Sequence, residues 1–158
     1  MKTTLASVFL GALLTIGGAA SAAGTAADPV VGTWTLNVAK STFSAGPALK
    51  SQTRIYSQSA QGITLNMKTV GADGKATTTQ TTYRLDGKDY PVTSPDYDSL
   101  SGKQIDPNTA EFTLKRAGKA VGTTRRTVSK DGKTLTATSK VTNAKGEALE
   151  DHTVFDKQ

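Results

Sequence analysis

The sequence predicts an all-β protein in which an antiparallel up-and-down meander of about eight to ten strands closes into a barrel. The tripeptide Asp-Gly-Lys occurs at residues 73–75, 86–88 and 131–133, each time between runs rich in Thr, Val and aromatic residues. Asp-Gly is a strong hairpin signal, because Gly adopts positive φ without strain and Asp tolerates it. Strand-like segments recur every ~8–12 residues, and helical periodicity is absent beyond the N-terminal stretch.

The N-terminal stretch, residues 1–22, has the pattern of a secretory signal peptide. Lys2 precedes an apolar run over residues 5–16, and Ala20-Ser21-Ala22 supplies a cleavage site. The run is too short to span ~30 Å of hydrocarbon, so we expect a cleaved signal rather than a membrane anchor. Residues 23–30 are expected to form a flexible leader, and residues 31–158 a single barrel domain.

Composition narrows the cellular setting and the class of partner. The chain has no Cys, which excludes a disulfide framework and a Cys-based metal site. Secretion without Cys is typical of bacteria, so we expect a periplasmic location, with the extracellular space second. The net charge is +6, but the lysines are dispersed over turns without interleaved aromatic residues. We therefore expect no nucleic-acid partner, an anionic partner being the alternative interpretation of the charge. We also expect a monomer.

The strands are predicted in order along the chain. The first, at residues 31–38, places Trp34, Leu36 and Val38 on one face. Residues 39–50 then form a connection with room for one helical turn, and residues 89–101, with two prolines, are expected to be irregular. Turn residues separate further strands at 52–59, 63–70, 76–85, 103–105, 109–116, 120–129, 134–142 and 147–156.

The segment 76–85 differs from the other strands because neither of its faces is strongly apolar. Thr77, Thr79, Thr81 and Tyr83 alternate with other polar residues. This pattern fits either a solvent-facing edge strand or a strand that lines a wet cavity. A barrel of this size is wide enough to hold one small ligand.

Two further groups of residues are candidates for ligand binding. Tyr90 and Tyr97, in the irregular segment, could stack on or hydrogen-bond a ligand at the barrel mouth; in the alternative, Tyr90 packs the rim and Tyr97 is exposed. Arg125 and Arg126 are adjacent, so one of them should face inward, where it needs either a ligand anion or a carboxylate such as Glu150 or Asp151. The predicted ligand-binding residues are Thr79, Thr81, Tyr83, Tyr90, Tyr97, Arg125 and Arg126.

Catalytic chemistry has little support in this sequence. His152 is the only histidine, so a catalytic triad or a His-based metal site would depend on it alone. The serines lie outside any Gly-x-Ser-x-Gly context. We therefore expect a protein that is not an enzyme and that uses neither a metal nor a cofactor.

Both ends of the domain resemble lipocalins and fatty-acid-binding proteins, the calycin barrels. Gly32-Thr33-Trp34 resembles the first strand of these families, and residues 153–157 resemble the closing strand of the fatty-acid-binding group. The Asp131-Gly132-Lys133 turn looks like that group's penultimate hairpin. The chain as a whole is similar to small secreted bacterial proteins of unknown function, through Gly-Thr-Trp-x-Leu-Asn at 32–37 and Asp-Gly-Lys-Asp-Tyr-Pro-Val at 86–92.

The resemblance implies a lipocalin-like barrel that binds a small amphipathic or hydrophobic molecule. Two departures stand out: the Arg-x-Tyr pair that holds a ligand carboxylate in the fatty-acid-binding group is replaced by Thr153 and Phe155, and residues 39–50 are too few for that group's helical lid. The alternative is a protein-interaction module, inhibitor-like or envelope-associated, with a filled barrel and with residues 23–29 as an inserting arm.

Overall fold

A computed structural model describes residues 26–44, 48–143 and 145–158, and the predicted signal peptide lies outside these residues. The described part of the chain contains eleven strands and one short 3₁₀ helix. In chain order they are β1 (Gly32–Leu36), η1 (Val38–Lys40), β2 (Thr42–Phe43), β3 (Ser51–Ser59), β4 (Gly62–Val70), β5 (Ala76–Tyr83), β6 (Asp86–Thr93), β7 (Ser99–Asp106), β8 (Thr109–Arg116), β9 (Lys119–Val128), β10 (Thr134–Thr142) and β11 (Ala148–Lys157).

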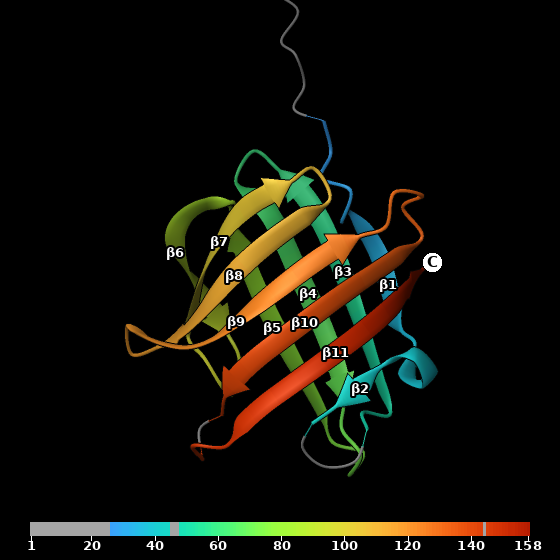
Figure 1. Cartoon of the computed structure of the whole chain (residues 1–158). Coiled ribbons are helices and arrows are strands. Elements are labelled where there is room, and N and C mark those ends of the chain that lie inside the picture. The colour runs from blue at the N-terminus through green and yellow to red at the C-terminus, as the bar shows by residue number, and fades with distance from the viewer. Residues whose placement is uncertain (1–25, 45–47, 144) are drawn as a thin grey trace, which may run out of the picture.

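The strands form one closed antiparallel barrel, which confirms the predicted fold class. From β3 to β11 each strand pairs with the next along the chain, and β1 pairs with both β3 and β11. The two-residue β2 pairs with β11 further along the same strand, so β1 and β2 together cover its edge. Figure 1 shows β8–β11 crossing in front of β3–β5 at a steep angle, with β2 against β11.

Two of the three Asp-Gly-Lys tripeptides form the predicted hairpin turns. Gly74 and Gly132 have φ of +83° and +70°, between β4 and β5 and between β9 and β10. The Asp side chain before each Gly accepts a hydrogen bond from the backbone N–H of the Lys after it, at 2.9 Å in one turn and 3.1 Å in the other. Local hydrogen bonding and the freedom of Gly thus fix both turns.

The third tripeptide, residues 86–88, is not a hairpin turn, so that prediction is wrong. Gly87 also has positive φ, but it lies inside β6, where the β6–β7 register shifts between Asp86 and Asp89. A glycine at positive φ can insert one extra residue into a strand as a bulge, and the sequence of a bulge then matches that of a turn.

The prediction that residues 89–101 are irregular is also mostly wrong, because β6 and β7 cover all of this segment except residues 94–98. Pro91 fits into β6 because the pairing between β5 and β6 ends next to it, at Thr81 and Val92. A proline is tolerated at such an edge, where its missing N–H leaves no ladder bond unmade.

The contact between β5 and β6 is a weak seam in the barrel. These two strands share two residue pairs, whereas β3 and β4, and likewise β10 and β11, share nine. Beyond Thr93 the chain turns away through residues 94–98, so the first half of β5 has no strand beside it on that side.

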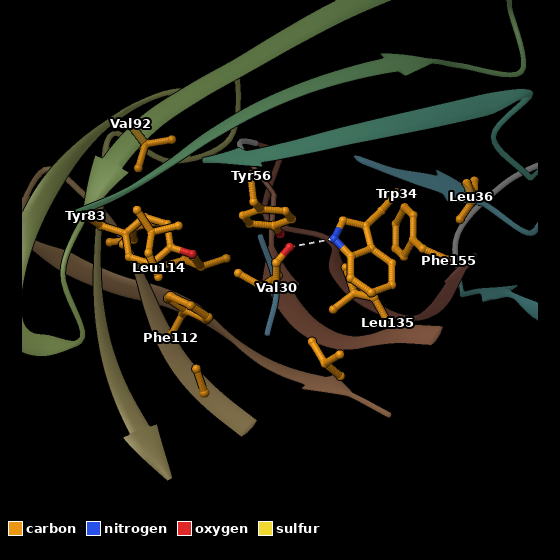
Figure 2. Packing of buried hydrophobic residues seen from close by; sticks show 14 residues of the cluster. Val30, Trp34, Leu36, Tyr56, Tyr83, Val92, Phe112, Leu114, Leu135 and Phe155 are labelled. Carbon is orange, nitrogen blue, oxygen red and sulfur yellow. Dashed lines mark hydrogen bonds between the residues drawn. The ribbon is translucent and has the colours of Figure 1, made fainter. Parts of the chain in front are cut away.

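Aromatic and aliphatic side chains from all around the barrel fill the end where the chain enters. Trp34 and Phe155 are fully buried there together with Leu135 and Val30. The indole Nε1 of Trp34 donates a hydrogen bond to the Val30 carbonyl at 2.7 Å (Figure 2). Trp34 and Leu36 face the core as predicted, but Val38 does not, because β1 ends at Leu36 and Val38 is exposed in η1.

Residues 26–30 of the predicted leader are held against this end of the barrel. The backbone N–H of Asp28 donates to the Gln58 side chain at 2.7 Å, and the Asp28 carboxylate accepts from the N–H of Val30 at 2.9 Å. Val30 is 0% exposed. This stretch therefore closes the barrel end and belongs to the folded domain.

Candidate ligand cavity

The inner face of β5 carries three of the predicted ligand-binding residues. Thr79, Thr81 and Tyr83 are buried, whereas the residues between them are exposed. The hydroxyl of Thr81 donates to the Pro91 carbonyl at 2.9 Å across the seam with β6. One face of this strand therefore points into the barrel, but only Tyr83 of the three borders the interior cavity described below.

Arg126 is the inward-facing member of the arginine pair. It is 3% exposed, and its Nη1 donates to the Tyr83 hydroxyl at 2.7 Å while its Nη2 lies 3.3 Å from an Asp28 carboxylate oxygen. The guanidinium also lies 5.6 Å from the ring centroid of Tyr56 and 5.4 Å from that of Phe112. Its Nε has no hydrogen-bond partner among the described residues.

The carboxylates expected to neutralise this arginine are engaged elsewhere. Glu150 pairs with Lys140 at 3.0 Å, and Asp151 accepts from the Ser44 N–H at 3.1 Å. Asp28 from the leader takes their place beside Arg126. Arg125 faces outward and pairs with Glu111 at 3.0 Å, so it is not part of the interior.

Burial controls the protonation of the Tyr83–Arg126 pair. Desolvation raises the pKa of Tyr83 far above its ordinary value, and the opposing effect of Arg126 is smaller. Desolvation also disfavours the charge on Arg126, but the neighbouring Tyr83, Tyr56 and Asp28 outweigh it and raise the pKa of the guanidinium. At neutral pH a neutral phenol therefore accepts a hydrogen bond from a charged guanidinium.

A cavity of about 140 Å³ lies inside the barrel beside this pair. Its walls combine aromatic rings with aliphatic and thioether groups, and a few polar groups reach it. The apolar part includes Tyr56, Leu65, Met67, Tyr97, Leu100, Phe112, Leu114 and Val141, and the polar part comprises Arg54, Thr124, Arg126, Ser139 and the hydroxyl of Tyr83. In Figure 2, Tyr83, Phe112 and Leu114 lie close together on one side of the core; the rings of Tyr83 and Phe112 meet edge to face at 5.3 Å.

Arg54 is a cavity residue that the sequence analysis missed. Gln52, Arg54 and Tyr56 alternate on the inner face of β3, while Ile55 between them points outward and is 47% exposed. Nε of Arg54 donates to Oε1 of Gln52 at 2.9 Å, and the guanidinium lies 4.2 Å from the ring centroid of Phe155. The signal was the alternation itself, which places Arg54 on the same face as an aromatic residue two positions later.

Tyr97 and Tyr90 have different positions. Tyr97 borders the cavity, and burial raises the pKa of its hydroxyl, with Arg54 acting in the opposite direction. Tyr90 packs at the rim, where its hydroxyl donates to the Asp86 carboxylate at 2.9 Å. Of the seven predicted binding residues, the cavity walls thus include Tyr83, Tyr97 and Arg126; Thr79 and Thr81 face inward without bordering it.

Larger hollows exist on the outside of the barrel. One of about 580 Å³ lies over the outer face of β7–β10, bordered by outward side chains such as Lys103 and Arg125, and another of about 680 Å³ flanks the leader at Asp28. Both are open to solvent; charged and threonine side chains border the first, and the second has largely apolar walls that include Ala60, Ile63 and Leu85. The interior cavity is smaller, but its buried aromatic walls and converging polar groups are what a small-molecule site requires.

The remaining candidate chemistry stays dispersed in the described part of the chain. His152 is exposed on β11, with its Nδ1 3.1 Å from the Thr138 hydroxyl. No group of three or more His, Asp or Glu side chains there could hold a metal ion. Among the described helices, none has the length and apolarity needed to cross a membrane.

Comparison with known proteins gives one result at the level of structure. No family model and no curated protein sequence matches the chain. A similar solved structure is the ileal bile acid-binding protein of zebrafish, crystallised with cholic acid, which shares 11% identity. The match covers 82% of this chain and 99% of that chain, with a TM-score of 0.45, and at this level it carries no inference about function.

The strand order, the barrel closure and the interior cavity together define the class of this protein. It is a closed antiparallel up-and-down barrel, the architecture that the resemblance of its two ends to lipocalins and fatty-acid-binding proteins implied.

Proposed function

We propose that this barrel is a non-enzymatic binding protein for a small amphipathic or hydrophobic molecule, which it holds in its interior. The observation that carries the proposal is the cavity of about 140 Å³ with aromatic walls and inward-facing arginines. Apolar cavities of this kind bind ligands because the ligand leaves water while the walls gain contacts. The sequence supports the further proposals that the protein acts as a monomer in the periplasm or outside the cell, and that it needs no cofactor.

The size of the cavity restricts the ligand. An apolar cavity of about 150 Å³ engineered into another protein takes up benzene, whereas drug-sized ligands occupy roughly 300–1,000 Å³. The apolar part of the ligand should therefore be about as large as a single aromatic ring. A longer molecule would fit only if the barrel opened, and the β5–β6 seam is where it has the fewest strand pairs to break.

Met67 offers a direct test, because its side chain borders the cavity and the chain has only two methionines. In protein that starts at residue 23 and carries ¹³C-methyl methionine, Met67 gives the only methyl signal of this kind. We expect toluene and benzyl alcohol to shift this signal saturably.

Two variants make the test specific for the interior. Leu114→Phe adds volume inside the cavity and should abolish the shift, whereas Ile105→Phe adds the same ring type at an exposed position and should leave it unchanged. Absence of any shift near the solubility limit of both probes, or a shift that persists in Leu114→Phe, would contradict the proposal. Either result would favour the alternative function, a protein-interaction module with a filled barrel.

A further inference from the structure

The two guanidinium groups of the interior differ in how their charge is compensated. Arg126 forms an ion pair with Asp28, and both side chains are largely buried, at 4% and 12% exposure. Its Nη1 is occupied by Tyr83. The cation at the closed end of the barrel therefore already has its anion, which the chain itself supplies.

Arg54 has no such anion. The described residues include every Asp and Glu of the chain, and none of these lies within ion-pair distance of Arg54, nor does any accept a hydrogen bond from it. Its one side-chain acceptor is the neutral amide of Gln52. The Arg54 side chain is half-buried, so water screens its charge less than at the surface, and an anion that joins it there gains correspondingly.

The position of Arg54 is fixed before any ligand arrives. Gln52 is buried, donates from its Nε2 to the Thr69 hydroxyl at 2.8 Å and accepts from Nε of Arg54 at 2.9 Å. The ring of Phe155 supports the guanidinium at 4.2 Å. These contacts leave the terminal edge with Nη1 and Nη2 available, and two parallel N–H groups match the two oxygens of a carboxylate.

We infer that Arg54 is the anion-binding group of the cavity and that its ligands are small aromatic carboxylates. The carboxylate binds the terminal edge of Arg54, and the ring occupies the cavity of about 140 Å³ between Tyr97, Leu114 and Phe112. This inference depends on the proposed function, because it names the ligand class of the same cavity.

Isosteric ligand pairs test the inference. Benzoate and benzamide, and phenylacetate and phenylacetamide, differ in charge but hardly in size. Followed through the Met67 methyl signal or by calorimetry, the carboxylate of each pair should bind the wild-type chain about tenfold or more tightly than the amide, the effect of one charge-assisted hydrogen bond.

Variants assign that preference to Arg54. Arg54→Gln should bring the ratio of carboxylate to amide affinity close to one while the affinity for the amide is retained, and Arg54→Lys should keep most of the preference. Arg125→Gln removes a matched arginine from the outer face and should leave the ratio unchanged. Far-UV circular dichroism and urea unfolding verify that each variant is folded. If Arg54→Gln does not fold, the ligand pairs measured on Arg54→Lys and on the wild-type chain still decide the question.

The outcomes separate this inference from the proposed function. Equal affinity of the wild-type chain for carboxylate and amide, or a preference that survives in folded Arg54→Gln, would overturn the role of Arg54 while toluene binding still supports a ligand-binding barrel. If neither the ligand pairs nor toluene bind, the proposed function itself fails.

Discussion

At the residue scale, the most consequential contact is the ion pair between Asp28 and Arg126. The two residues are 98 positions apart in the sequence, and the pair joins the leader to β9. A buried ion pair adds little stability in comparison with apolar packing, but the loss of one partner leaves an uncompensated charge inside the protein. Asp28 is therefore expected to matter far more for stability than its place outside the strands suggests.

Asp28→Ala should lower the free energy of unfolding by about 3 kcal/mol, the lower end of the range for breaking a buried pair, because the Asp28 side chain keeps 12% exposure. The matched control is Glu111→Ala, which breaks the exposed pair with Arg125 and should cost less than about 1 kcal/mol. Urea denaturation of both variants measures the difference. Equal losses would show that the Asp28–Arg126 pair contributes no more than a surface pair.

At the element scale, glycines carry two different duties in the hairpins. Gly132 has φ of +70° in the β9–β10 turn, and a Cβ there would meet no atom within 4 Å. Gly122 on β9 is needed for space, because a Cβ would lie 2.3 Å from the Lys140 carbonyl oxygen on β10. The first glycine serves backbone conformation and the second serves the close approach of two strands.

Alanine substitutions should separate these duties. Gly132→Ala should cost about 1 kcal/mol, the penalty of a left-handed alanine, and Gly132→Asn should cost less. Gly122→Ala should cost about 3 kcal/mol, because the backbone of β10 must move. The ranking is checked by urea unfolding of the three variants, and a Gly122→Ala variant as stable as Gly132→Asn would refute it.

At the scale of the whole molecule, the barrel is unevenly closed. Nine residue pairs join β10 to β11, and two join β5 to β6. Local opening requires the breaking of backbone hydrogen bonds, so it should begin where they are fewest. The seam also lies on the side of the barrel where β5 carries buried threonines rather than large apolar residues.

Amide hydrogen exchange should therefore be faster in Ala76–Tyr83 than in Thr134–Thr142 under native conditions. Exchange measured by mass spectrometry on peptides from the two segments makes the comparison within one sample. Equal protection of both segments would mean that the seam is as stable as the rest of the barrel.

The features of the fold that were predicted correctly are those that depend on residues close together in the sequence. Trp34, the turns at Gly74 and Gly132 and the alternation of the strands depend on near neighbours, and they were recognisable. Gly87 was misassigned because a bulge and a turn use the same positive φ.

The site was less predictable, because its key contacts join distant parts of the chain. Adjacent arginines face opposite ways, but nothing local says which of them is inside, and nothing local points to Asp28 as the partner. Arg54 was missed because a charged residue on the inner face of β3 breaks the apolar pattern by which an inner face is recognised.

The pairing of β1 with β11 has a consequence for synthesis. Asn37, just after β1, donates to the Asp156 side chain, and the two residues are 119 positions apart. A chain made from its amino end therefore cannot close the barrel until its last strand has left the ribosome, and slow folding is expected of such distant pairings. A product that stops before β11 would expose the edges of both β1 and β10, and open edges pair with other molecules. The ten residues of β11 thus cover the edges of both β1 and β10 and close the barrel.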